Sequence, residues 1–257
     1  MLKIIYHESY LTPYSTSVAE SPTRIKAIHN RLKERYETVV PDPATVEDIL
    51  RVHTREHLRR VQVQGRDTYQ TALMAAGGAL CGARLAALEG ARSFAAVRPP
   101  GHHAGRARHG GFCFFNNVAV GVASLLHGGY IRKAVVVDTD MHHGDGTEDI
   151  FSDVESVAVI NIRAKEREAY LDLLREELAR IPRVDLIAVS AGFDLYVRDW
   201  GGLLETSDFR RIGFAIHQAA VERASGKCFA VLEGGYFLDH LGRNVLAFCR
   251  GLEGERE

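Results

Sequence analysis

The segment DTDMHHGDG, from Asp138 to Gly146, concentrates carboxylates and imidazoles directly after the apolar run Ala134–Val137. A short run of β-branched or small apolar residues that ends in acids is typical of a buried parallel strand, and ligands of open α/β sheets bind beyond the carboxyl ends of such strands. Asp140 and His142 are two residues apart, so an extended backbone would project both to one side, where they could hold one ion together. Asp138 would project the same way. An isolated Asp-x-His pair is more often a solvated turn, so the rest of the chain must decide.

Three further strand-like runs also lead to side chains that can do chemistry. The loop after Val97 carries adjacent histidines, the run that ends at Ser190 leads to an acid, and paired glycines after Leu232 lead to a phenol; these groups are His102, His103, Asp194 and Tyr236. Taken singly, they fit solvated histidines, a turn or helix-capping acid, and a buried structural tyrosine. Four strand ends that all supply metal ligands, acid–base groups or donors predict a metal-assisted hydrolase.

The elements that must position these groups alternate between strand-length apolar runs and helical patterns. The predicted strands are Leu2–Tyr6, Ser93–Val97, Ala134–Val137, Val157–Ile162, Leu186–Ser190 and Cys228–Leu232. The predicted helices are Pro22–Arg35, Thr68–Leu88, Asn117–Leu126, Glu168–Arg180 and Asp208–Ala224, the first capped by Ser21 and the last by Thr206 or Ser207. This alternation predicts a single α/β domain over residues 1–257, with a mostly parallel central β-sheet flanked by helices on both faces.

Composition and charge argue against several classes of partner. The chain has 257 residues, of which 46% are hydrophobic, enough to bury a large core. Its 32 basic and 33 acidic residues balance without a block of like charge, so we expect no nucleic-acid and no membrane partner. No apolar run approaches a membrane span and no targeting segment is evident, so we expect a cytoplasmic protein. The four scattered cysteines form no Cys-x-x-Cys pair, which argues against a thiolate zinc site or a disulfide scaffold. Oligomeric state is left open.

Motifs along nearly the whole chain resemble those of the histone deacetylases and acetylpolyamine amidohydrolases, which have the arginase/deacetylase fold. They are ESPTR at 20–24, VHT at 52–54 followed by HL at 57–58, AAGG at 75–78, RPPGHHAGRARHGGFCFFNNVAVG at 98–121, VVVDTDMHHGDGT at 135–147, SAGFD at 190–194 and VLEGGY at 231–236. Together these motifs are highly specific. The resemblance implies a deacetylase-like α/β fold and hydrolysis of an acyl amide.

The resemblance also implies a catalytic zinc held by Asp140, His142 and Asp194. Two carboxylates and one imidazole leave a fourth coordination position for water, as a catalytic zinc site requires. The same oxygen and nitrogen donors suit iron(II) or cobalt, so the residues alone leave the metal open. The tandem histidines match the acid–base pair of the family, which makes His103 the expected general base and acid and His102 its electrostatic or proton-donating partner.

Other positions of the family pattern complete the expected catalytic groups. The resemblance pairs His102 with Asp138 and His103 with Asp145, and such carboxylates fix the imidazole tautomer and raise its basicity. Tyr236 matches the tyrosine that donates a hydrogen bond to the scissile carbonyl, where charge builds on oxygen in the transition state.

The resemblance implies two further sites. Phe112, beside Gly111, matches an aromatic wall of the acyl-lysine channel, with a core phenylalanine as the alternative. Many family members also hold a monovalent cation such as K⁺ near the zinc, and the matching oxygens here belong to Asp138, Asp140, His142, Asn161 and Ile162. Asn161 replaces the serine that is common in the family.

The chain departs from the family pattern in the loops around the site. After Ile162 the family usually has a long Gly/Pro-rich loop with an aromatic that faces the one matching Phe112, whereas here residues 163–166 lead almost directly into a helix. The segment before the Ala75 helix is also short, so the resemblance assigns Asp67 no role in gripping substrate. Because loops carry specificity, we expect a complete catalytic apparatus behind a wider, shallower mouth.

The leading hypothesis is zinc-dependent hydrolysis of an acylated amine such as acetyl-lysine, an acetylpolyamine or a small N-acetyl metabolite. One alternative is a dimanganese ureohydrolase, which shares the fold but needs more bridging carboxylates and imidazoles. The other is a non-catalytic, metal-containing binding protein for acylated amines. Retention of His102, His103 and Tyr236 counts against this last alternative, because metal binding alone does not need them.

Overall fold

All the strands that the computed structural model describes, over residues 2–256, form one parallel sheet. The strand order is β2-β1-β3-β7-β6-β4-β5, and every neighbouring pair is parallel. The strands are β1 Lys3–Ile5, β2 Glu37–Val39, β3 Ser93–Ala95, β4 Ala134–Asp138, β5 Val157–Asn161, β6 Leu186–Ala191 and β7 Cys228–Leu232. The prediction of a central parallel sheet is confirmed, and no antiparallel strand pair joins it within the described residues.

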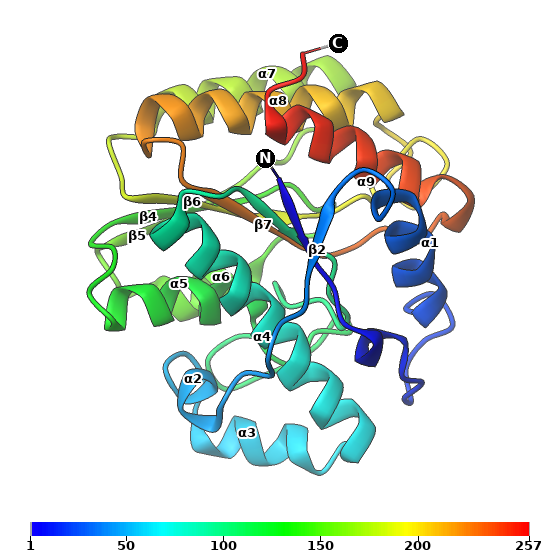
Figure 1. Cartoon of the computed structure of the whole chain (residues 1–257), viewed down its shortest axis with the longest axis vertical. Coiled ribbons are helices and arrows are strands. Elements are labelled where there is room, and N and C mark those ends of the chain that lie inside the picture. The colour runs from blue at the N-terminus through cyan, green and yellow to red at the C-terminus, as the bar shows by residue number, and fades with distance from the viewer. Residues whose placement is uncertain (1, 257) are drawn as a thin grey trace.

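Helices cover both faces of this sheet, as predicted (Figure 1). On one side lie α4 Arg66–Glu89, α5 Asn117–His127 and α6 Asp145–Phe151, with the short helices α2 Val46–Leu50 and α3 Arg55–Gln62 beyond them. On the other side lie α1 Pro22–Leu32, α7 Arg167–Arg180, α8 Thr206–Arg223 and α9 Leu238–Glu253. A 3-10 turn, η1, spans Glu8–Leu11. The sheet is therefore the middle of three layers.

The predicted strands all appear, and the differences lie at element ends and in elements that the sequence pattern did not indicate. The edge strand β2 and the helices α2, α3, α6 and α9 were not predicted. The expected cap of α8 was wrong: its N-cap is Glu205, whose side chain and that of Asp208 form a reciprocal capping box. Ser21 is the N-cap of α1, but its side chain makes no capping hydrogen bond. Pro22 at the first position, with its fixed φ, starts that helix.

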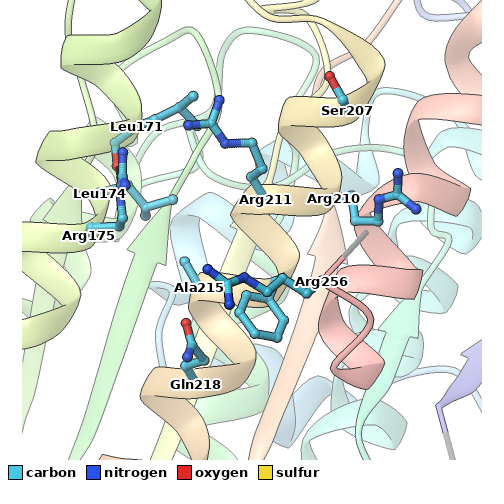
Figure 2. A pocket seen from close by; sticks show the side chains of 10 residues that line it. Leu171, Leu174, Arg175, Ser207, Arg210, Arg211, Ala215, Gln218 and Arg256 are labelled. Carbon is cyan, nitrogen blue, oxygen red and sulfur yellow. Dashed lines mark hydrogen bonds between the residues drawn. The ribbon is translucent and has the colours of Figure 1, made fainter.

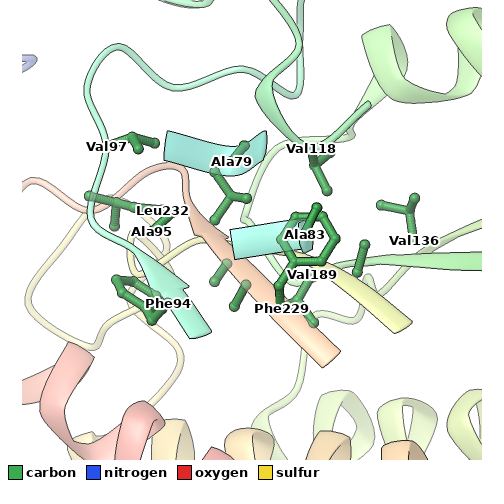
Figure 3. Close-up of a cluster of buried hydrophobic side chains, with 14 of the residues drawn as sticks. Ala79, Ala83, Phe94, Ala95, Val97, Val118, Val136, Val189, Phe229 and Leu232 are labelled. Atoms are coloured by element: carbon green, nitrogen blue, oxygen red, sulfur yellow. The ribbon is translucent and has the colours of Figure 1, made fainter. Parts of the chain in front are cut away.

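The core consists of side chains that alternate between the two faces of the sheet (Figure 3). Phe94 on β3 lies toward α9, with its ring centroid 6.0 Å from that of Phe248. Phe229 on β7 lies toward α4 and α5, where Gly121 leaves the room that its ring needs, since a Cβ there would come 3.2 Å from it. Both aromatic side chains are fully buried. Period-two alternation along each strand thus supplies apolar groups to both helical layers.

Helix α4 is long and apolar enough to cross a membrane by length and composition alone, contrary to the expectation that no run approaches a span. Within its most apolar window, 78% of the residues are buried inside the protein. Its small residues explain this burial: Gly77 and Gly78 face Asp42 and Tyr10 so closely that a Cβ at either position would clash. The helix is apolar because it packs between the sheet and α5, as a core helix does.

The register of the sheet brings four chain segments to one edge. Asp138 pairs with Ser190 of β6, and Ser190 pairs with Val231 of β7. Because the strands are parallel and in step, the segments after β4, β6 and β7 leave the sheet at the same level. The loop after β3 joins them there. The predicted convergence of polar residues at the strand ends is therefore a consequence of the register.

Candidate active site

Asp140, His142 and Asp194 form a compact set of potential metal ligands at this edge. Their ligand atoms all lie within 4.8 Å of one another. His142 Nδ1 lies 3.1 Å from Asp140 Oδ1 and 3.1 Å from Asp194 Oδ2. Both aspartates are buried, whereas the His142 side chain is 37% exposed. The set therefore has a dry floor of carboxylates and opens to solvent on the side of the imidazole.

The surroundings of these residues fit a bound cation. Asp194 Oδ2 is buried and has no hydrogen-bond partner, while Oδ1 accepts the Met141 N–H at 3.1 Å. Asp140 Oδ2 accepts the Gly234 N–H at 2.8 Å, which fixes that carboxylate. A Cβ on Gly234 would come 2.6 Å from oxygens of both aspartates, so only glycine leaves this space free. An unpartnered buried carboxylate oxygen is costly unless an ion or proton satisfies it.

The local charge also favours a cation. Burial and the neighbouring Asp140 raise the pKa of Asp194 to about 7. The hydrogen bond to Asp140 and the close approach of the Asp194 carboxylate raise the pKa of His142 to about 10. Both shifts favour the protonated form, because two carboxylates close together in a buried site stabilise a proton or another positive charge between them. Two oxygens and one nitrogen suit zinc or another borderline divalent ion.

His102 and His103 lie beside this set, each held by the carboxylate that the sequence analysis assigned to it. His102 Nδ1 lies 2.9 Å from Asp138 Oδ2, and His103 Nδ1 lies 2.7 Å from Asp145 Oδ1. Their ring centroids are 4.1 Å apart, and the His103 ring is 5.8 Å from that of His142. Each imidazole thus has one nitrogen anchored, which leaves Nε2 as the atom available for proton transfer.

The two histidines differ in protonation because their environments differ. Burial alone would lower the pKa of His102, but the carboxylates of Asp138 and Asp140 outweigh it and raise that pKa well above its usual range. Burial, followed by the charge of His102, lowers the pKa of His103. One imidazole is therefore cationic and the other neutral at neutral pH. A pair of titratable groups driven apart in this way is typical of acid–base catalysis.

Glu233 is a buried carboxylate that holds the histidine loop. Its Oε2 accepts the N–H groups of Gly101 at 2.6 Å and His102 at 3.1 Å, and its Oε1 accepts the Ser190 hydroxyl at 3.2 Å. Cys113, His102 and Glu233 also have their ligand atoms within 4.8 Å of one another. Unlike Asp194, however, Glu233 has partners on both oxygens. Its role is to position the loop, and sequence reasoning quoted it in a motif without assigning that role.

Tyr236 is held over the site by two residues that the sequence analysis did not assign. The fully buried Arg24 donates to the Gly235 and Glu233 carbonyls at 2.6 Å each, and its guanidinium lies 4.8 Å from the Tyr236 ring centroid. Asp199 Oδ2 accepts the Tyr236 N–H at 2.6 Å. Burial raises the pKa of Tyr236 far above its usual range, so the phenol keeps its proton. It is thus available as a hydrogen-bond donor.

A second anchor holds the loop between the histidines and Phe112. His53 Nδ1–H donates to the Gly105 carbonyl at 2.9 Å, and its Nε2 accepts the Asn116 N–H at 2.9 Å. His57 Nε2 lies 2.7 Å from the Phe114 carbonyl. Burial lowers the pKa of His53 to about 3, so this histidine is neutral and serves as a bridge between two backbone segments. These two histidines explain the His-rich motif at 52–57 as structural.

The space above the ligand set is a cavity of about 190 Å³, here called the acyl cavity. It is lined by Pro100, His102, His103, Gly111, Phe112, His142, Trp200, Gly234 and Tyr236. Phe112 meets the Tyr236 ring edge-on, with centroids 6.1 Å apart. The structure therefore places Phe112 at a wall of the cavity, and its half-buried side chain is not part of the core.

Trp200 supplies the wall that the sequence analysis expected to be missing. The segment after Ile162 is short, as expected, and α7 begins at Arg167. Trp200 comes instead from the loop after β6, stacks on Tyr236 at 4.0 Å with an interplanar angle of 20°, and meets His142 edge-on at 6.2 Å. The short segment after Ile162 is confirmed, but the expectation of a wide mouth overlooked this indole. The signal available in the sequence was the single tryptophan of the chain, which lies in the segment that follows Asp194.

The expected monovalent-cation residues lie together at the ends of β4 and β5. Asp138 and Asn161 are register partners, and the Ile162 N–H donates to the Asp138 carbonyl at 3.0 Å. Asn161 Oδ1 accepts the Gly144 N–H at 2.8 Å, and its amide donates to Glu148 at 2.7 Å. The cation site itself stays a prediction. Asp67, at the start of α4, is not among the residues that line the acyl cavity.

Another hollow, between α7 and α8, is larger but has no part in this chemistry (Figure 2). It measures about 420 Å³ and is lined by Leu171, Leu174, Arg175, Ser207, Arg210, Arg211, Phe214, Ala215, Gln218 and Arg256. None of these residues belongs to the ligand set or to the histidine pair. Its walls are helix surfaces rather than strand ends, so we assign the active site to the smaller acyl cavity.

Comparisons with known proteins agree with this assignment. Residues 18–171 match the family model of the histone deacetylase domain. A probable deacetylase of Methanothermobacter thermautotrophicus is 33% identical over 98% of this chain and 91% of its own length. The acetylpolyamine amidohydrolase of Mycoplana ramosa is 30% identical over 73% of this chain and 64% of its own length.

A solved structure shows the same fold. The crystal structure of the HDA15 HD domain superimposes with a TM-score of 0.84, covering 98% of this chain and 91% of that domain. The two sequences are 24% identical, so this likeness speaks for the fold alone. The α/β fold with a single parallel sheet is thereby shown.

Proposed function

The chain belongs to the histone deacetylase family, and from that premise we propose that it is a zinc-dependent amidohydrolase that removes an acetyl or other acyl group from an amine. One observation carries the proposal: a ligand set with an unsatisfied carboxylate oxygen reaches, through His142, the same small cavity that a histidine pair and a protonated tyrosine line. Metal binding alone would not require the histidine pair or the tyrosine. Together they meet the requirements for hydrolysis of an amide.

Asp140, His142 and Asp194 would hold the metal. A bound divalent ion supplies Lewis-acid polarisation of the carbonyl and lowers the pKa of water. The two carboxylates neutralise most of its charge, which leaves the removal of the water proton to a neighbouring base. His103 is that base in our proposal, because its pKa is lowered and it is therefore neutral and ready to accept a proton at neutral pH.

The remaining groups act on the substrate. Tyr236 donates a hydrogen bond to the scissile carbonyl, on which negative charge grows as water attacks. His102, cationic between Asp138 and Asp140, stabilises that charge by electrostatics. The proton taken up by His103 passes to the departing amine. The products are the carboxylic acid in its ionised form and the free amine, which balances the addition of one water.

The two alternative functions have less support. A ureohydrolase needs a second metal with its own ligands. The other candidate group among the described residues, His102, Cys113 and Glu233, has its carboxylate fully occupied by hydrogen bonds. A binding protein has no use for an imidazole whose pKa is lowered beside one whose pKa is raised. Metal stoichiometry tests the first alternative, and product analysis tests the second.

The direct test is acetate release by the zinc-loaded protein from acetyl-lysine peptides, acetylated polyamines and small N-acetyl amines. Chelated protein serves as the control. We expect chelator-sensitive release from at least one class. If substrates bind with zinc present but no acid is released from any acyl group tested, the hydrolase proposal fails and the binding-protein alternative gains support.

A further inference from the structure

A second cavity lies behind Trp200, next to the acyl cavity. This side cavity measures about 360 Å³ and is lined by Asp140, Met141, Ile162, Arg163, Ala164, Lys165, Tyr170, Leu195, Trp200, Gly201 and Leu203. It shares Trp200 with the acyl cavity, and each cavity contacts one residue of the metal-ligand set. The two cavities therefore lie on either side of Trp200, each beside one residue of the metal-ligand set.

The side cavity owes its existence to the short connection between β5 and α7. Only residues 162–166 separate Asn161 from the first residue of α7, so no loop fills the space. On the other side, backbone hydrogen bonds fix the loop of Trp200: the Gly201 N–H donates to the Asp194 carbonyl at 2.8 Å, and the Leu203 N–H donates to the Leu195 carbonyl at 2.9 Å. The partition between the cavities is thus anchored to the ligand set.

The charged side chains of the side cavity are mainly positive. Arg163 and Lys165 both line it, and no carboxylate lies within 4.0 Å of either charged group in the part of the chain that the structure describes. Among the described residues that line either cavity, Asp140 is the only acidic one, and its oxygens face His142 and the Gly234 N–H. Both residues are exposed, so a ligand at the mouth of the side cavity meets two cations that no described carboxylate pairs with.

Acidic groups near the mouth are already engaged. Asp145 is bonded to His103 and, at 2.6 Å, to Arg108, and Asp199 accepts the Tyr236 and Phe237 N–H groups. No carboxylate is therefore free at these positions to receive the ammonium groups of a polyamine.

We propose that the side cavity receives a carboxylate of the substrate, so that the preferred substrates are acylated amines that carry a free carboxylate close to the acyl amide. This inference rests on the proposed amidohydrolase function and names its substrate class. A carboxylate meets Arg163 and Lys165 with opposite charge, and the arginine fork suits its two oxygens. An ammonium group in the same place would face repulsion from both residues. The carboxylate belongs either to a small molecule or to an acidic residue that flanks an acyl-lysine.

The test uses substrates that differ only in the charge of one end. N-acetyl-5-aminopentanoate, N-acetylpentylamine and N-acetylcadaverine carry a carboxylate, a methyl and an ammonium group on chains of similar length. Two acetyl-lysine peptides, with aspartate or lysine beside the acetyl-lysine, distinguish a peptide source of the carboxylate from a small molecule. For wild-type protein we expect kcat/KM to fall from carboxylate to neutral to ammonium, by about tenfold or more across the series.

Two double variants locate the effect. Arg163→Glu with Lys165→Glu should reverse the order within the series. Lys133→Glu with Arg183→Glu makes the same change in net charge beside the amino ends of β4 and β6, at the opposite edge of the sheet, and should leave the order unchanged. Arg163→Gln with Lys165→Gln removes both positive charges without adding negative ones, so the three substrates should have similar kcat/KM. This variant replaces the double glutamate variant if that one does not fold.

The outcomes separate this inference from the proposed function. If acetate is released from the three amines at equal rates, or fastest from N-acetylcadaverine, the carboxylate inference is overturned while the hydrolase stands. If no acid is released at all, the hydrolase proposal has failed, and calorimetric titration with the same three ligands still decides the inference. Tighter binding of the carboxylate ligand by wild type than by the Arg163→Gln, Lys165→Gln variant supports it, and equal binding refutes it.

Discussion

The floor and the rim of the candidate active site are built differently. The floor, formed by Asp140, Asp194, Gly234 and His102, comes from the segments that follow four strands, is buried, and has fixed partners for most of its polar atoms. The rim comes from loops, and its most prominent side chain, Trp200, is 52% exposed. The register of the sheet determines the floor, whereas loop length determines the rim. Chemistry and substrate choice are therefore encoded in separate parts of the chain.

Glycines provide the sharpest contrast between floor and rim. In Gly234→Ala the new methyl would come 2.6 Å from oxygens of both Asp140 and Asp194, so we expect loss of bound metal and of nearly all activity. In Gly110→Ala, in the loop before Phe112, the new methyl meets nothing within 4 Å, and this variant should behave as wild type. Metal content after dialysis and acetate release are the measurements. A fully metallated and active Gly234→Ala variant would show that the floor is less rigid than the structure indicates.

Tyr236 separates substrate activation from metal binding within the floor. Tyr236→Phe removes the hydrogen bond to the reacting carbonyl, which in oxyanion sites is worth about 10²–10³ in kcat. Because the phenol is no metal ligand, we expect metal content to be unchanged. Tyr130→Phe, which changes an exposed tyrosine, is the matched control. Loss of metal together with turnover would mean that Tyr236 has a structural role instead.

Trp200 tests the rim. Trp200→Ala removes the partition and its stacking on Tyr236, and aromatic pairs of this kind contribute about 0.5–1.5 kcal/mol beyond burial. We expect KM to rise by about tenfold, equivalent to about 1.4 kcal/mol, with a smaller change in kcat and no change in metal content. Steady-state kinetics with one good substrate measures this. A fall in kcat with KM unchanged would place Trp200 in the chemistry rather than in binding.

The smallest expected effect is a displacement of the pH profile. Burial and the charge of His102 lower the pKa of His103, so its neutral, basic form persists below the usual range, and the acid limb of kcat/KM should lie below about pH 6.5. The hydrogen bond that His103 donates to Asp145 opposes this shift, so Asp145→Asn should move the limb to still lower pH. A limb that moves upward in Asp145→Asn would mean that another group is the base.

Much of the floor could be predicted from the sequence because its signals are local. An apolar run that leads into Asp138, Asp140 and His142 marks a buried strand and the polar turn at its carboxyl end, and the same logic located Asp194 and Tyr236. Parallel strands bring their carboxyl ends to one edge whatever the strand order. The order itself, and which helices cover each face, needed the structure.

Other elements and contacts could not be predicted, because they have no local sequence signal or depend on residues far away in the chain. The edge strand β2 is three residues long and partly exposed, so it has no apolar alternation. Helix α9 does carry a helical period in Leu241, Val245 and Phe248, which was overlooked after the glycine-rich turn. Trp200 could not be placed over Tyr236 from spacing, because their contact depends on how two separate loops leave the sheet.

The most direct test of the account compares two neighbouring histidines. His142 lies in the ligand set, whereas His143 is more exposed and bonded to Glu148 at 2.8 Å. We predict that His142→Ala loses bound zinc and chelator-sensitive acetate release together, and that His143→Ala retains both. Zinc content and acetate release measured on the same samples decide the matter. A His142→Ala variant that keeps its zinc and turns over at the wild-type rate would contradict the assignment of the metal site.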